Sequence, residues 1–344
     1  MFKFVFDKLI VCKFFICKKI ATTMYANKIS KLCVLFSLFT VFISLNQSAF
    51  GEVMITSLKD DKEILQQMID NGVHSKKICD KYIDRYVVIS GIEYYNFDGI
   101  LMKDGVIVAN DAFAESVVKI FNELKIKKFP IAKINPVVEK KVVNLLPFGL
   151  FGLKKKVDDE DANFTSSYCC RKIKDTDRLS LHAYGAAIDL NVLQNPCIYI
   201  DEEKKKVNVY PKNGVMYLNR KIVRQNKPFG TGKVDDDVVK IFQKYGYDVW
   251  GGDWDTPIDY QHFQVSTRSF VNLLIAVTKN DARKIFNKHV ICFNKNGKSL
   301  SDIASEKDID LLDEYTKDID LNKKNFFKTI NNLCKIKEQK KQLL

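Results

Sequence analysis

The alternation of hydrophobic and polar positions predicts both helices and strands in this chain. Apolar residues spaced three or four positions apart mark three helical segments, and short runs of β-branched and aromatic residues mark two strands. Three aspartates at the start of the last helical segment favour its N-terminus, and a glycine closes it. The helices are expected over residues 57–71, 112–124 and 234–245, and the strands over residues 86–89 and 92–97.

Two segments interrupt this pattern. Residues 137–163 combine glycines with a run of lysines at 154–156 and a run of acids at 158–161, which predicts a solvated loop. Beyond Ser269 the sequence is rich in lysine and helical in pattern, which predicts a basic appendage outside the main unit. Such a helix can lie on a membrane or an anionic polymer, or it can pack on its own domain.

The first 51 residues have the order of a secretory signal peptide. Lys28 and Lys31 precede an apolar run over residues 32–45, and small residues at Ala49 and Gly51 follow it. The run is short for a membrane span, so we expect cleavage near Gly51, with retention as an uncleaved anchor as the alternative. The protein is therefore expected to be exported, to the periplasm or the cell exterior.

Composition and charge narrow the class of protein. The chain of 344 residues is 46% hydrophobic and 28% charged, which is typical of a globular protein. Residues 52–344 keep 48 basic against 41 acidic side chains, a net charge of +7 that suits an anionic polymer. No arginine-rich stripe, zinc-finger spacing or aromatic RNA-binding motif is present, so a nucleic-acid partner is not expected.

Six cysteines lie beyond residue 51. In an oxidising compartment some of them would pair, although their spacing gives no connectivity. Cys169 and Cys170 are adjacent and do not form a C-x-x-C pair, which argues against a thiolate zinc site. Structural disulfides or buried thiols are expected instead, at positions 79, 169, 170, 197, 292 and 334.

Candidate chemistry rests on two of the four histidines. A turn through Gly185 separates His182 from an alternating stretch that can present Asp189 back towards it. His262 follows a turn-rich run of tryptophans and glycines, with Asp259 three residues before it as a candidate general base. Two imidazoles and a carboxylate would leave the fourth position of a tetrahedral zinc ion open for water. Either histidine alone could equally be an ordinary core or surface residue.

The other two histidines, His74 and His289, lack a neighbouring carboxylate-and-glycine context. They are expected to be surface residues.

Two ordered motifs resemble the VanY-like and L-alanyl-D-glutamate endopeptidase group of zinc peptidases. The first, S-x-H-x-x-G-x-A-x-D, is matched over residues 180–189 at every fixed position. The second is W-G-G-D-W at residues 250–254, followed by an acid three positions before His262-Phe263. The resemblance covers residues 94–266, about half of the chain, and includes the Cys170-Arg171 step.

This resemblance implies an α+β fold, in which a small, mainly antiparallel sheet carries the site and helices cover its other face. It also implies one Zn²⁺ ion held by His182, Asp189 and His262, with Asp259 as general base. Arg171 would stabilise the oxyanion of a scissile peptide bond in peptidoglycan, because its guanidinium is a permanently charged fork of donors. Residues expected to contact the substrate are Ser180, Tyr184, Trp250 and Asp253.

The expected organisation has four parts, with the oligomeric state left open. These are a signal peptide (1–51), a helix-and-strand preamble (52–93), a zinc peptidase domain (94–269) and a basic helical extension (270–344). The shared motifs do not separate an L-Ala-D-Glu endopeptidase from a D-Ala-D-Ala carboxypeptidase. Two other classes stay open: a non-catalytic, zinc-containing cell-wall-binding module, and a surface protein that works through its basic tail.

Overall fold

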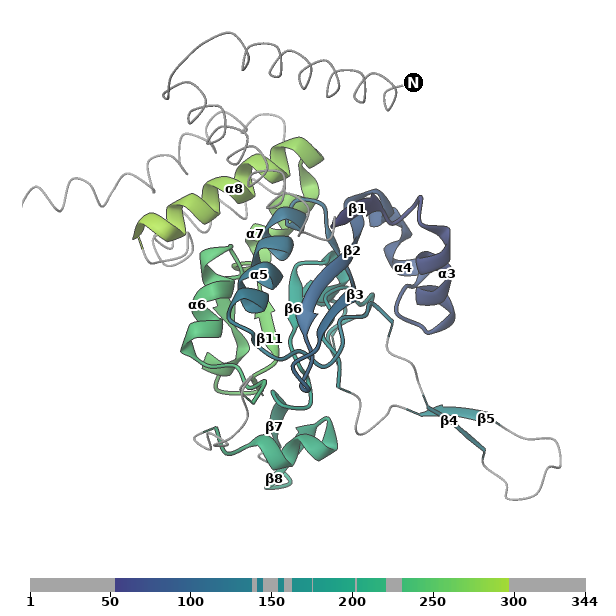
Figure 1. Cartoon of the computed structure of the whole chain (residues 1–344). Coiled ribbons are helices and arrows are strands. Elements are labelled where there is room, and N and C mark those ends of the chain that lie inside the picture. The colour runs from purple at the N-terminus through teal and green to yellow at the C-terminus, as the bar shows by residue number, and fades with distance from the viewer. Residues whose placement is uncertain are drawn as a thin grey trace, which may run out of the picture. The chain divides into compact units, whose positions relative to one another are not determined.

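The computed structural model divides the chain into two units, residues 1–51 and residues 52–344. The residues described here belong to the second unit (Figure 1). They are 53–137, 141–144, 154–157, 163–174, 176–201, 203–220 and 231–296. The expected signal peptide, including the apolar run at 32–45, lies outside them and stays a prediction. Among the described residues, no helix is both long and apolar enough to cross a membrane.

The described residues form short strands and helices in alternation. The strands are β1 (Met54–Ser57), β2 (Tyr86–Tyr95), β3 (Leu101–Asn110), β4 (Lys141–Asn144), β5 (Lys154–Val157), β6 (Ala187–Asp189), β7 (Cys197–Asp201), β8 (Lys206–Tyr210), β9 (Val249–Trp250), β10 (Ile258–Asp259) and β11 (His262–Gln264). The α-helices are α3 (Lys62–Asp70), α4 (Lys76–Cys79), α5 (Ala114–Ile126), α6 (Asp236–Lys244), α7 (Arg268–Ala276) and α8 (Lys279–Asn296). The 3₁₀ helices are η1 (Asp80–Arg85), η2 (Leu181–Tyr184), η3 (Lys212–Tyr217) and η4 (Gly251–Asp253).

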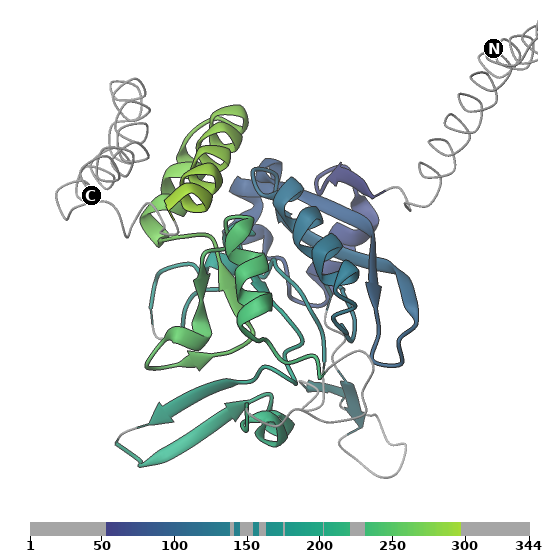
Figure 2. The ribbon, with the colours of Figure 1, turned by 60° about the vertical axis from the view of Figure 1, so that its left-hand side comes forward.

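Antiparallel strands β1-β2-β3 form a sheet (Figures 1 and 2), and the central stretch of the β2-β3 pair is buried on both faces. The paired Ile89 and Ile107 point into a core shared with α5, α6 and β11. Their neighbours Val88 and Val108 point to the opposite face and pack against the preamble. Because successive side chains of a strand alternate between faces, nearly every position of the central stretch must be apolar, as the sequence has it.

Two smaller antiparallel sheets lie around the candidate site. One has the order β6-β11-β9 and the other β10-β7-β8. Phe263 of β11 is fully buried and stacks on Phe242 of α6, with ring centroids 3.8 Å apart. The central strand of the first sheet is therefore fixed to the main core.

The preamble is tied to the rest of the unit by covalent and polar contacts. A disulfide joins Cys79 to Cys170 across 91 positions of sequence. His74 is buried and contacts the Tyr168 hydroxyl through Nδ1 at 2.7 Å and Asp80 through Nε2 at 2.8 Å. The expectation that His74 is a surface residue was wrong, because Tyr168, 94 positions away in sequence, packs against it.

Helices α7 and α8 pack into the same core as β11. Phe270, Leu274 and Phe286 are among the buried residues of that core. His289 is fully buried against Asp248, with Nε2 and Oδ1 3.1 Å apart, so its expected surface position was also wrong. The boundary predicted at residue 269 therefore does not separate residues 270–296 from the core. Residues 297–344 lie outside the described part.

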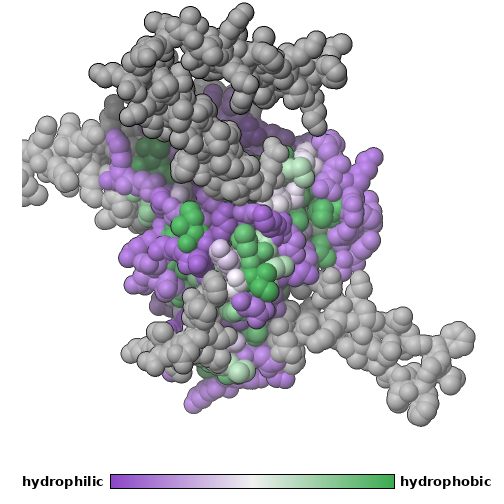
Figure 3. Space-filling model, in the orientation of Figure 1, coloured by the Kyte–Doolittle hydropathy of each residue, from purple (hydrophilic) through white to green (hydrophobic). Residues whose placement is uncertain are grey.

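The α+β class with small antiparallel sheets is confirmed. Helices appear near the predicted ranges, and the Asp235 side chain accepts the Val238 amide at 3.0 Å as the cap of α6. The two predicted strands merge into β2, so the predicted boundary at residue 93 falls within one strand. Residues 137–163 contain the β4-β5 hairpin, not only a loop. On the face drawn in Figure 3, hydrophilic residues dominate among the described residues, and hydrophobic ones form small, separate patches.

Candidate metal centre

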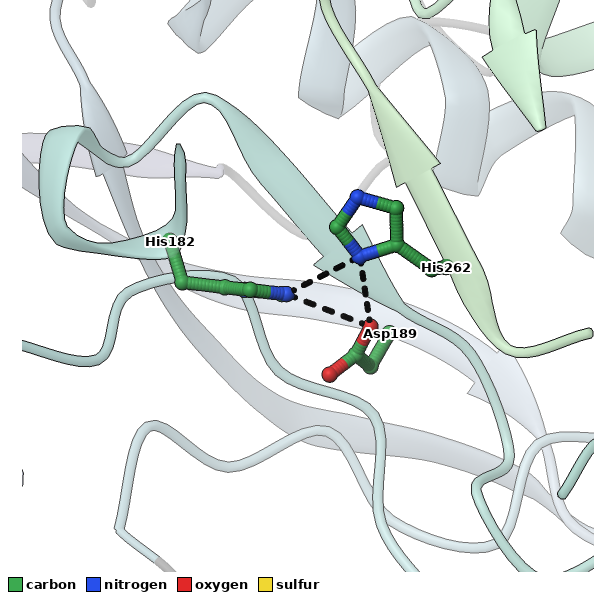
Figure 4. A group of neighbouring side chains, drawn as sticks. All are labelled: His182, Asp189 and His262. Carbon is green, nitrogen blue, oxygen red and sulfur yellow. Dashed lines mark hydrogen bonds and ion pairs between the residues drawn. The ribbon is translucent and has the colours of Figure 1, made fainter. Parts of the chain in front are cut away.

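Three side chains from different elements converge on one point (Figure 4). His182 comes from η2, Asp189 from the end of β6 and His262 from the start of β11. His182 Nε2 lies 3.1 Å from His262 Nδ1, and Asp189 Oδ1 lies 3.3 Å from each of these nitrogens. Among the described residues, these are the ones that form a group of His, Cys, Asp or Glu suited to a metal ion.

Strand pairing brings two of these residues together. His262 is the direct antiparallel partner of Asp189, so their side chains share one face of the β6-β11 pair. Gly185, in the left-handed region at φ 61°, ends η2 and returns the chain into β6. A Cβ there would lie 2.5 Å from the backbone nitrogen of Asn110, so glycine is required for this close approach.

The second nitrogen of each imidazole is held by a hydrogen-bond acceptor. His182 Nδ1 lies 2.5 Å from the Ser167 carbonyl oxygen, and His262 Nε2 lies 3.1 Å from the Gln264 side-chain oxygen. Neutral rings that donate these bonds direct their other lone pairs at one another across 3.1 Å. Two facing lone pairs repel, so this arrangement favours a cation between them.

The donor set fits a zinc ion. Zinc ligands at about 2.0–2.1 Å in tetrahedral geometry are separated from each other by about 3.3 Å, close to the three distances found here. Asp189 Oδ1 is buried without a hydrogen-bond partner, which a bound cation would provide. Two imidazoles and a carboxylate are also ligands that zinc accepts in catalytic sites.

The electrostatics of the cluster keep Asp189 ionised. Burial opposes ionisation, but the adjacent His182 and His262 outweigh it and hold the pKa of Asp189 well below its ordinary value. For His262 burial lowers the pKa, whereas Asp189 raises it, and the net result is a raised pKa. The carboxylate is thus in the form that binds a metal ion.

Asp259 lies beside the cluster. Burial, together with the nearby Asp189, raises the pKa of its carboxyl, an effect that His262 and His182 only partly offset. Gly251 makes room for this strand, because a Cβ there would lie 2.6 Å from the Asp259 carbonyl oxygen and 3.2 Å from the Cβ of His262. A buried carboxylate with a raised pKa next to a candidate metal centre is suited to accept a proton.

Arg171 is exposed, and its backbone is fixed near the cluster. Its carbonyl oxygen accepts the Ser180 amide at 2.9 Å, just before η2, and the disulfide to Cys79 starts at the preceding residue. Burial raises the pKa of Tyr199 on β7, and the Arg171 guanidinium opposes this rise only in part. The guanidinium therefore lies within electrostatic reach of the strand that pairs with β10.

The four expected substrate residues differ in their surroundings. Ser180 is buried, and its hydroxyl accepts the His182 amide at 3.4 Å as the cap of η2. Tyr184 packs against Tyr82, with ring centroids 5.5 Å apart. Trp250 donates from its indole nitrogen to the Tyr260 carbonyl at 3.0 Å, and Asp253 is exposed in η4. These contacts support a structural role for Ser180, and substrate binding by the four stays a prediction.

Sequence reasoning missed the supporting residues of the cluster. Gln264 stands two positions after His262 in a strand, a spacing that puts both on one face and could have identified it. Cys197 is the direct partner of Asp259 in the β10-β7 pair, and Tyr199 follows on the same face. No local signal marks these two residues, because the pairing of β7 with β10 spans about sixty positions.

A family model described as D-alanyl-D-alanine carboxypeptidase matches residues 174–265. The matched segment is 92 of the 344 residues and includes the His182–Asp189–His262 cluster and Asp259, but not Arg171. No curated protein and no solved structure matches the chain. The match supports a peptidase, and the His-Asp-His cluster is consistent with the zinc dependence expected for it.

Proposed function

We propose that this protein is a zinc-dependent peptidase that hydrolyses stem peptides of peptidoglycan. The observation that carries the proposal is the convergence of His182, Asp189 and His262 at ligand spacing, with the half-buried Asp259 beside them. The match to a D-alanyl-D-alanine carboxypeptidase model supports the substrate class.

In the proposed reaction, Asp259 accepts a proton from the attacking water and delivers it to the leaving amine. Zinc, when bound, polarises the peptide carbonyl and lowers the pKa of water to about 7. Arg171 donates hydrogen bonds to the developing oxyanion. Ser167 and Gln264 hold the two imidazoles in the orientation and tautomer that ligands require.

The bond that is cut depends on residues around the cluster. Both an L-Ala-D-Glu endopeptidase and a D-Ala-D-Ala carboxypeptidase use the chemistry described above. Residues 196–201 and 203–220 flank the site through β7, β8 and η3. We propose that residues 196–226 select between these substrates. Export to the cell wall compartment is part of the proposal, and the disulfide between Cys79 and Cys170 is consistent with it.

A test uses purified residues 52–344 loaded with zinc and incubated with peptidoglycan fragments. Mass spectrometry is expected to show either new D-glutamate amino termini or loss of a terminal D-alanine. Asp259→Asn should keep zinc and lose turnover, whereas His182→Ala should lose both. Undiminished turnover in Asp259→Asn contradicts the assigned base, and a zinc-loaded wild type without any product favours a non-catalytic zinc-containing binding module.

A further inference from the structure

Tyr199 on β7 interacts electrostatically with two residues of the proposed mechanism, Asp259 and Arg171. Cys197 pairs directly with Asp259 across the β7-β10 ladder. Tyr199 is two positions further along β7, so it occupies the same face and is the diagonal neighbour of Asp259. A long side chain at a diagonal position can reach its neighbour, which places the Tyr199 phenol beside the base.

Electrostatic contacts of the phenol agree with this placement. Burial of the hydroxyl raises the pKa of Tyr199, and Cys197 and Asp259 raise it further, whereas Arg171 lowers it. The hydroxyl therefore interacts electrostatically with both Asp259 and Arg171, and its raised pKa keeps it protonated at neutral pH. Tyr199 as a whole is 49% exposed, so a substrate can reach its ring and its hydroxyl edge.

The hydroxyl is held weakly in the free protein. The Tyr199 hydroxyl interacts with the thiol of Cys197, a residue that is 2% exposed and that also interacts with Asp259. A sulfur atom is a weak acceptor, so a developing negative charge would compete well for this donor. Cys197 is not part of the group formed by the three candidate ligands, so its contacts connect Asp259 and Tyr199 rather than complete the metal centre.

We propose that Tyr199 is a catalytic residue that donates a hydrogen bond to the oxyanion of the scissile peptide, together with Arg171. This inference rests on the proposed peptidase function. In this proposal, a carbonyl carbon attacked by water beside Asp259 lies near Tyr199, the diagonal neighbour of Asp259, so its oxygen is accessible to the phenol. The phenol supplies a neutral donor and Arg171 a charged one.

The test compares Tyr199→Phe, which removes only the hydroxyl, with Tyr245→Phe at the end of α6. Tyr245 donates its hydroxyl to Glu123 at 2.9 Å, outside the residues assigned to the site, so it controls for loss of a tyrosine hydroxyl. Steady-state rates on a defined stem peptide give kcat and KM, and zinc content and unfolding midpoints show whether each variant is intact. Tyr199→Phe is expected to lower kcat about 10²-fold with KM and zinc content unchanged.

Tyr199→His keeps a ring with a donor and is expected to retain more kcat than Tyr199→Phe. A Tyr199→Phe variant within about twofold of the wild-type kcat, or one that changes only KM, overturns the role of Tyr199 while leaving the peptidase proposal intact. A wild type that cleaves no stem peptide overturns both. Equal losses in Tyr199→Phe and Tyr245→Phe would point to a general loss of stability and also contradict the assignment.

Discussion

Replacing both Cys79 and Cys170 with alanine should destabilise the second unit substantially. The disulfide joins positions 91 residues apart, and closing a loop of this length lowers the entropy of the unfolded chain. The chain-entropy relation gives a contribution of about 4.6 kcal/mol at 25 °C for a loop of this size. At a urea slope of about 3 kcal/mol per molar, the midpoint of unfolding should fall by about 1.5 M.

The assay is urea unfolding of residues 52–344, followed by circular dichroism, in wild type and double variant. Substitution is preferable to a reductant, because Cys292 is also disulfide-bonded and a reductant would open that bond too. Cys169→Ala is the matched control, since this adjacent cysteine lies outside the disulfide. If the double variant loses less than about 1 kcal/mol of unfolding free energy relative to wild type, the entropic reasoning is refuted.

Two other predictions concern the folded unit. The carboxylate of Glu93 is buried and lies 2.9 Å from the Lys125 ammonium group. Burial raises the pKa of Glu93, but Lys125 and Lys103 outweigh burial, so the pKa is lowered. A carboxyl group whose pKa is lower in the folded state stabilises the fold at pH values above its unfolded pKa of about 4.3. This stabilisation is lost as the pH falls through the folded pKa. Wild type should therefore be more stable than Glu93→Gln at pH 7, with a difference that shrinks in acid unfolding curves below about pH 4; a constant difference contradicts this. Gly185→Ala should lower the free energy of unfolding by about 1–3 kcal/mol more than Gly72→Ala does, as measured by urea unfolding. Both glycines have positive φ, but of the two only Gly185 has backbone atoms within 3 Å of an added Cβ. Equal losses in the two variants would contradict this prediction.

The sequence predicted the candidate ligands because their signals are local. His182, Gly185 and Asp189 lie within one turn and strand, and His262 follows its own turn-rich run. Pairing of Asp189 with His262 could be expected only through the family resemblance, since the two residues are 73 positions apart. Motifs that are short and ordered along the chain are thus the part of a site that sequence reasoning can find.

Long-range partners explain what the sequence did not predict. His74 is buried because it forms a hydrogen bond with the hydroxyl of Tyr168, which is 94 positions away in sequence. His289 is buried because α8 brings it to Asp248. Tyr199 reaches the site through the pairing of β7 with β10, which no local pattern indicates. In each case the polar partner belongs to another element, so the environment of the residue exists only after folding.

The most direct test of the account measures peptide hydrolysis as zinc is returned to chelated protein. Residues 52–344, stripped with a chelator and dialysed, should show no turnover of a stem peptide, and turnover should rise with added zinc and saturate at one ion per chain. Asp189→Ala, treated in the same way, should neither bind the ion stoichiometrically nor regain turnover. Full hydrolysis by the stripped wild type would contradict a metal centre at His182, Asp189 and His262.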